Sequence, residues 1–201
     1  MDIIWHGNSC FTLKSKNATV VINPDHSIKT PLKGDVVISS LGEDAKLAEV
    51  KDIKKTFTWP GEYEIAGVAI SSLPAWTRSR SKEESGEKGE DTLIFCIEME
   101  DVSICHLGGL GHKLTTEMVE EIGDVDVLLV PVGKNSNLGD KAEEVVDQID
   151  PRVVILMGDE HPENFAKDLK AQLGEKLEKY TITSVGKLPQ EKTEYYVLTK
   201  V

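Results

Sequence analysis

The sequence predicts an α/β fold in which two sheets pack together and helices cover their outer faces. Residues 2–5, 10–14 and 18–22 read as strands joined by short polar turns, which favours an antiparallel meander. The second half of the chain alternates strand-like runs with helical patterns, which is typical of a sheet covered by helices. Antiparallel strands followed by this alternation favour two sheets over one doubly wound sheet.

The remaining elements of the first half follow from apolar runs and turn residues. Residues 36–38 form an unbroken apolar run, which is typical of a strand that is covered on both faces. Residues 56–59 and 68–73 also read as strands, with a turn at Pro60 between them. The charged stretch 43–54 is expected to form a short helix.

In the second half, β-branched and apolar residues mark strands, and apolar residues at helical spacing mark helices. The expected strands are residues 92–99, 102–106, 125–132, 153–157, 180–185 and 195–201. The expected helices are residues 115–122, 141–149 and 163–173, the first capped by Thr115 or Thr116.

Composition limits the class of protein. A chain of 201 residues can bury one full core, so residues 1–201 are expected to form a single domain. The net charge of −12 disfavours nucleic-acid binding. With no apolar run of about 18 residues and no secretory signal pattern, we expect no membrane span and a cytoplasmic location. Cys10, Cys96 and Cys105 lie in strand-like runs and are expected to be free thiols.

The loop after the strand at residues 36–38 occupies a place where sheet-based enzymes often carry catalytic groups. It reads Ser39-Ser40-Leu41-Gly42-Glu43-Asp44-Ala45, without histidine or cysteine. Taken alone, this segment is more typical of a strand-to-helix turn with a polar cap than of a catalytic loop.

Several motifs resemble the metallo-β-lactamase superfamily, in particular its branch of small soluble zinc-dependent hydrolases that includes the ascorbate-6-phosphate lactonases. The matching runs are Trp5-His6-Gly7-Asn8-Ser9-Cys10-Phe11, Asn23-Pro24, Pro60-Gly61-Glu62-Tyr63-Glu64, the run from His106 to His112, and the run from Ile122 to Gly133. The resemblance spans nearly the whole chain and implies a four-layer αββα sandwich.

The same resemblance implies that most of the family's metal ligands are absent. Its H-x-H-x-D-H loop corresponds to residues 40–45, where only the aspartate remains. The seven former ligand positions carry Ser40, Gly42, Asp44, Ala45, Thr77, Gly109 and Gly158. Zinc requires three or four converging Cys, His or carboxylate donors, and Asp44 alone does not supply them.

Two functional hypotheses follow from this loss. In the first, the chain has lost its metal site and hydrolase activity, needs no cofactor, and acts as a binding or structural protein. In the second, it is a metal-dependent hydrolase of lactones, esters or phosphodiesters with an altered metal site, in which zinc is the expected ion. We expect the first, with no catalytic residue identified. The sequence names no ligand, and the expected partner is a second copy in a twofold dimer.

The chain's histidines leave one route to a rebuilt metal site. Asp44, His26 and His161 lie in loops that could face the former pocket. The alternative is that His26 and His161 lie on surface loops. His106 and His112 are expected to form hydrogen bonds with loop backbone.

Residues 77–91, TRSRSKEESGEKGED, contain no strong apolar residue and are expected to form a mobile charged loop. In a brief limited digest, a protease should cut this segment before any other, because nothing in it can anchor the backbone to the core. Mass spectrometry of the first fragments measures the site. First cuts elsewhere, with residues 77–91 intact, would show that the segment is docked.

Overall fold

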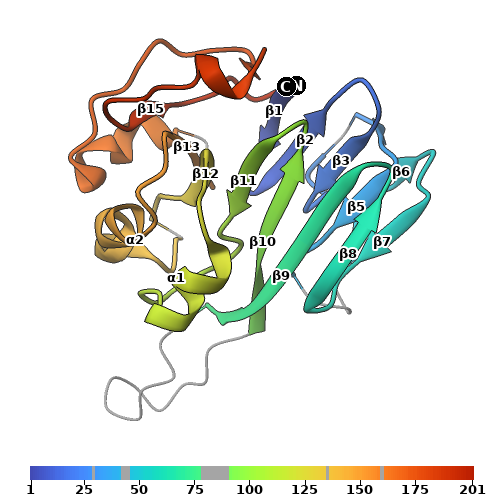
Figure 1. The fold of residues 1–201 in the computed structure, drawn as a ribbon, viewed down its shortest axis with the longest axis horizontal. Helices are drawn as coiled ribbons and strands as arrows, with labels where there is room; N and C mark the ends of the chain where they lie inside the picture. Colours follow the sequence, from blue (N-terminus) through green and yellow to red (C-terminus); the bar gives the residue numbers. More distant parts are fainter. Residues whose placement is uncertain (29, 42–45, 78–90, 135, 159–160) are drawn as a thin grey trace.

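The computed structural model is an α/β sandwich of two large sheets, as the sequence predicts (Figure 1). It describes residues 1–28, 30–41, 46–77, 91–134, 136–158 and 161–201. The last residue lies beside the first strand, since the Val201 amide donates to the Trp5 carbonyl at 3.1 Å. No helix in these ranges is long and apolar enough to cross a membrane.

The first sheet begins with the expected meander, in which β1, β2 and β3 pair antiparallel. The strands β3, β5 and β7 then run parallel. In spatial order the sheet contains β14 (Tyr180–Thr181), β1 (Asp2–Gly7), β2 (Cys10–Lys14), β3 (Thr19–Ile22), β5 (Val36–Ile38) and β7 (Lys55–Phe57).

The second sheet combines an antiparallel half with a parallel half. In spatial order it contains β15 (Glu194–Tyr196), β13 (Val153–Met157), β12 (Val127–Pro131), β11 (Val102–His106), β10 (Asp91–Met99), β9 (Val68–Trp76) and β8 (Gly61–Ile65). The strands β11, β12, β13 and β15 are parallel, and β8 to β11 are antiparallel.

One core fills the space between the sheets, and a second lies under the helices. The inner core includes Trp5, Phe11 and Phe95, all with at most 2% of their surface exposed. Four helical segments follow the strands of the parallel half: α1 (Thr116–Ile122), η1 (Gly139–Lys141), α2 (Ala142–Ile149) and η2 (Pro162–Leu169). Of these, the α-helices α1 and α2 and the 3-10 helix η2 contribute side chains to the second core. A further 3-10 turn, η3, spans Val185–Lys187.

Two helix predictions were wrong. Residues 46–54 contain β6 (Val50–Lys51), which pairs with β4 (Leu32–Lys33), and Val50 and Leu32 bury their side chains on the first sheet. The predicted helix 163–173 is instead η2, which ends at Leu169 because Lys170 adopts a left-handed conformation. Leu173 then pairs with Tyr195 in an isolated bridge. The loop predicted at 77–91 lies outside the described residues except at Thr77 and Asp91.

Candidate functional site

The candidate site lies where strand ends of both sheets meet along one edge. In the first sheet, the carboxyl ends of β3 and β5 lead into Asn23 and Ser39, and the β1–β2 turn at Asn8 reaches the same edge. In the second sheet, β11 and β13 end at the matching edge. Loops at the carboxyl ends of parallel strands are a common place for binding and catalysis.

The side chain of Asn23 joins three of these loops. Asn23 is fully buried and has a φ of 47°, a left-handed conformation that asparagine tolerates. Its Nδ2 donates to Ser9 Oγ at 3.1 Å and to Ser40 Oγ at 2.8 Å, and its Oδ1 accepts from the Ser40 amide at 2.7 Å. These bonds fix the position of Ser40 just after the end of β5.

A second set of hydrogen bonds connects Ser40 to the other sheet. Thr92 Oγ1, at the start of β10, donates to the Ser40 carbonyl at 3.1 Å and accepts from the Gly109 amide at 3.1 Å. Gly108 has a φ of 57°, and a Cβ built there would lie 3.0 Å from Ser40 Cβ. The loop after β11 therefore packs directly on the loop after β5.

The structure brings three of the predicted former ligand positions together. A Cβ at Gly109 would lie 3.4 Å from Thr77 Cγ2, and a Cβ at the neighbouring Gly108 would lie 3.0 Å from Ser40 Cβ. Gly158 lies at the same edge, since its amide donates to the Asn8 carbonyl at 2.9 Å. A Cβ at Gly158 would lie 3.1 Å from the Val132 carbonyl, and its φ of 104° disfavours any other residue. Gly42, Asp44 and Ala45 lie outside the described residues.

The described side chains at this edge do not fit the metal site that the resemblance to the metallo-β-lactamase superfamily implies. Ser40 and Thr77 offer hydroxyls, and Gly109 and Gly158 offer no side chain, whereas zinc binds thiolate, imidazole and carboxylate. Within the described ranges, no three His, Cys, Asp or Glu side chains are placed to hold a metal ion. A metal site here therefore requires donors other than the family's usual ones.

The proposed replacement donors are only partly visible. His26 is exposed in the loop after β3. His161 is exposed just before η2, where its Nδ1 lies 3.6 Å from Glu163 Oε1. Asp44 lies outside the described residues, so the combination of Asp44, His26 and His161 stays a prediction.

The geometry adds Asp25 to the candidate residues. Its Oδ2 accepts from Asn8 Nδ2 at 3.0 Å, and its Oδ1 accepts from the Ser27 amide at 2.6 Å. Burial favours the neutral carboxyl, but the hydrogen bonds from Asn8 and Ser27 outweigh it and lower the pKa of Asp25. Asp25 is thus a half-buried, ionised carboxylate at the site edge. Its position next to Pro24 in the loop after the third strand was the available sequence signal.

His106 and His112 form backbone hydrogen bonds, as predicted. The Gly108 amide donates to His106 Nδ1 at 3.0 Å, so Nε2 carries the proton and donates to the Ser9 carbonyl at 3.0 Å. The Trp76 amide donates to His112 Nε2 at 3.3 Å. Burial lowers the pKa of His106 to about 4, because the charged ring would lose its hydration. The neutral side chain of His106 thus links the two sheets through a hydrogen bond to the Ser9 carbonyl.

The lowered pKa of His106 predicts a loss of stability in mild acid. The unfolded chain takes up a proton near pH 6.5, whereas folded His106 does so only near pH 4. His106 therefore stabilises the fold fully above pH 6.5, and this contribution falls as the pH drops from 6.5 towards 4. Urea unfolding should show that wild type loses about 2 kcal/mol more than His106→Gln between pH 7 and pH 5.

The matched control is His26→Gln, because His26 is exposed. Because His26 is also a candidate metal donor, the comparison uses protein stripped of metal by chelator, in which this variant should follow the wild-type pH profile. If the free energy of unfolding depends on pH equally in wild type and His106→Gln, His106 is not a buried, neutral side chain in the folded protein.

Known proteins that are similar to this chain are named metal-dependent hydrolases, and a solved structure shares its fold. A metal-dependent hydrolase from Methanopyrus kandleri is 26% identical over 85% of this chain and 92% of its own length. One from Archaeoglobus fulgidus is 23% identical over 86% of this chain and 92% of its own length. A crystal structure from Thermotoga maritima, described as a candidate zinc-dependent hydrolase of the metallo-β-lactamase superfamily, has a TM-score of 0.77 at 28% identity, covering 98% of each chain.

These findings correct one functional expectation and establish the family. The expectation that the protein has lost its hydrolase activity and acts as a binding or structural protein was wrong, since relatives along most of the chain are named metal-dependent hydrolases. The residues at the seven former ligand positions are therefore not enough to indicate a loss of activity. The family model of the β-lactamase superfamily domain matches residues 2–158, and the chain belongs to this family.

Proposed function

We propose that this protein is a metal-dependent hydrolase with an altered metal site, which cleaves a lactone, ester or phosphodiester. The reaction centre is the edge where the loops after β3, β5 and β11 meet. Family membership and the names of the relatives support the reaction class.

The observation that carries this proposal is the close approach of the loops themselves. A Cβ on Gly108 would lie 3.0 Å from Ser40 Cβ, and a Cβ on Gly109 would lie 3.4 Å from Thr77 Cγ2. A side chain at either glycine would meet a neighbouring loop, so three loops that are far apart in sequence approach one another closely. The surrounding hydrogen bonds of Asn23 and Thr92 hold the arrangement in place. A rigid set of converging loops is what a hydrolase needs to position its substrate.

The donors of the altered site are proposed to come from the loops after β3, β5 and β13. These are Asp44, His26 and His161, to which the geometry adds Asp25. Carboxylate and imidazole groups are suitable ligands for zinc, manganese and iron. Because the described residues do not complete a coordination sphere, no reaction step is assigned to the metal.

Charge suggests which of the three substrate classes to test first. The net charge of −12 repels an anionic phosphodiester more than a neutral lactone or ester. A neutral substrate is therefore the first candidate. The proposal also places the enzyme in the cytoplasm as a twofold dimer.

The test combines metal analysis with hydrolysis assays. Protein purified without chelator should contain near-stoichiometric zinc, manganese or iron, and it should hydrolyse a γ-lactone or a nitrophenyl ester. Chelator should abolish the activity, and the lost metal should restore it. Asp25→Asn and Asp44→Asn should each lower kcat/KM at least about tenfold, the usual scale for a lost metal-site contact.

Asp52→Asn is the matched control. Asp52 lies on the surface, paired with Lys33 Nζ at 3.8 Å, and its left-handed φ of 67° suits asparagine. This variant should keep wild-type activity and metal content. Protein that stays metal-free with added zinc, manganese or iron, and inactive on all three substrate classes, would overturn the proposal.

A further inference from the structure

Two cysteines lie directly opposite each other on neighbouring strands of the second sheet. Cys96 on β10 pairs with Cys105 on β11, and on its other side Cys96 pairs with Ser71 on β9. Residues directly opposite each other in antiparallel strands point to the same face of the sheet. Ser71, Cys96 and Cys105 thus form one row on the outer face, and both thiols are reduced here.

The backbone spacing of this pair suits a disulfide. Opposite residues in antiparallel strands have Cα atoms about 4.5–5.5 Å apart. Disulfides span Cα distances of about 4.4–6.8 Å. Cys96 and Cys105 can therefore be joined by side-chain rotation, with the strands left in place. Cys10, the third cysteine, is buried in the first sheet and is far from this row in the fold.

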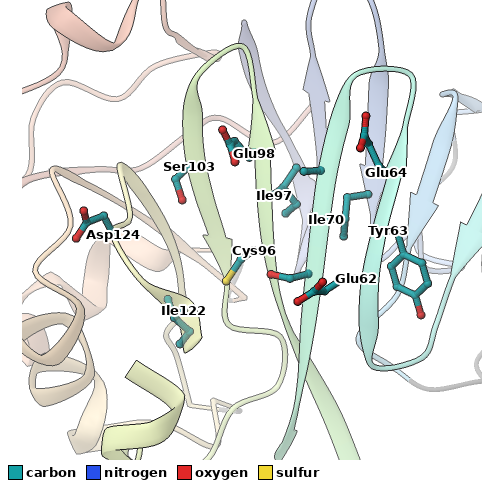
Figure 2. A pocket seen from close by; sticks show the side chains of 12 residues that line it. Glu62, Tyr63, Glu64, Ile70, Cys96, Ile97, Glu98, Ser103, Ile122 and Asp124 are labelled. Carbon is teal, nitrogen blue, oxygen red and sulfur yellow. The ribbon is translucent and has the colours of Figure 1, made fainter. Parts of the chain in front are cut away.

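A groove gives access to only one of the two thiols. The groove has a volume of about 560 Å³ and lies on the outer faces of β8, β9, β10 and β11, beside the end of α1. Figure 2 shows the Cys96 sulfur near Ile122 and Ser103, on the side of the sheet that lines this groove. Cys96 is partly exposed, whereas Cys105 is completely buried. A reagent in the groove therefore meets Cys96 first.

The neighbouring groups favour a thiolate at Cys96. A hydrogen bond with the Cys105 thiol lowers the pKa of Cys96, and so does one with Ser71, although burial and the charge of Glu121 oppose them. The bond to Cys96 and complete burial raise the pKa of Cys105. The reactive form of a cysteine is its thiolate, so Cys96 is the attacking sulfur and Cys105 the second partner.

Carboxylates on the groove select the type of oxidant. Glu62, Glu64, Glu98 and Asp124 line it. Figure 2 shows these side chains spread along the groove on both sides of Cys96. They repel anionic oxidants such as glutathione disulfide, but they do not repel a small neutral hydroperoxide.

We propose that Cys96 and Cys105 are a peroxide-reactive dithiol. The Cys96 thiolate attacks one peroxide oxygen, the O–O bond breaks, and the released hydroxide takes up a proton to leave as water. Cys96 is then a sulfenic acid. The Cys105 thiol attacks the Cys96 sulfur, the S–O bond breaks, and the leaving hydroxide takes the Cys105 proton and departs as a second water. Two thiols lose two electrons, and hydrogen peroxide gains them. The proposal does not depend on the hydrolase reaction.

The test is the oxidation of native protein by hydrogen peroxide. After treatment, catalase removes the oxidant, and a maleimide labels the remaining thiols in denaturant. Labelled thiols should fall from three to one in wild type. The intact mass should fall by two hydrogens, and a peptide map should link Cys96 to Cys105. Dithiothreitol should restore all three thiols.

Variants separate the two sulfurs. Cys105→Ala should leave a Cys96 sulfenic acid that dimedone traps, and Cys96→Ala should leave Cys105 fully labelled because it is buried. Cys10→Ser is the matched control and should still form the bridge. Circular dichroism checks that each variant is folded. Wild type that keeps all three thiols, or that links Cys96 only to a second molecule, would overturn the proposal.

Discussion

The buried amide of Asn23 is the interaction on which the candidate site depends most. Its nitrogen donates to Ser9 Oγ and to Ser40 Oγ, and its oxygen accepts from the Ser40 amide. Leaving a buried donor or acceptor unpaired costs about 1–3 kcal/mol. The hydrogen bonds of Asn23 therefore restrain the geometry of the loops and stabilise the folded state. Ser40, one of the positions that the sequence predicts to have carried a metal ligand, is part of this restraint.

The two sheets are joined at this edge by neutral polar groups. His106 reaches from the second sheet to the Ser9 carbonyl, and Thr92 reaches to the Ser40 carbonyl. A cluster of carboxylates and imidazoles without a cation would be costly in the same place, because buried charges lose hydration and repel each other. Hydroxyls, amides and glycine avoid that cost. Among the described residues of this edge, the ionised Asp25 lies at the periphery, where Asn8 and partial solvent contact support its charge.

Most of the fold could be predicted from the sequence because its strands are continuous apolar runs. The runs at Val36–Ile38 and Val153–Met157 are buried on both faces, as expected. The helix predicted at 163–173 was wrong because Phe165, Leu169 and Leu173 fit a helical stripe, while the backbone turns at Lys170 and takes Leu173 to Tyr195. Local spacing does not contain that long-range pairing.

The candidate site could be located from the sequence but not interpreted. The motifs identified the loops around Ser40, Thr77 and Gly109, which the structure brings together. The contacts of Asn23 with Ser40 and of Asn8 with Asp25 connect residues 17 positions apart and depend on tertiary packing. The absence of familiar ligands suggested a lost activity, whereas the relatives are named metal-dependent hydrolases.

We propose that the shared edge of the two sheets is a metal-dependent reaction centre. The most direct measurement is anomalous X-ray diffraction at the zinc edge, from crystals of protein purified without chelator and then soaked in zinc. Zinc should give an anomalous peak within ligand distance of Asp25 or of the loop that contains Asp44. Soaked crystals with no peak at this edge, or with zinc bound only elsewhere on the protein, would contradict it.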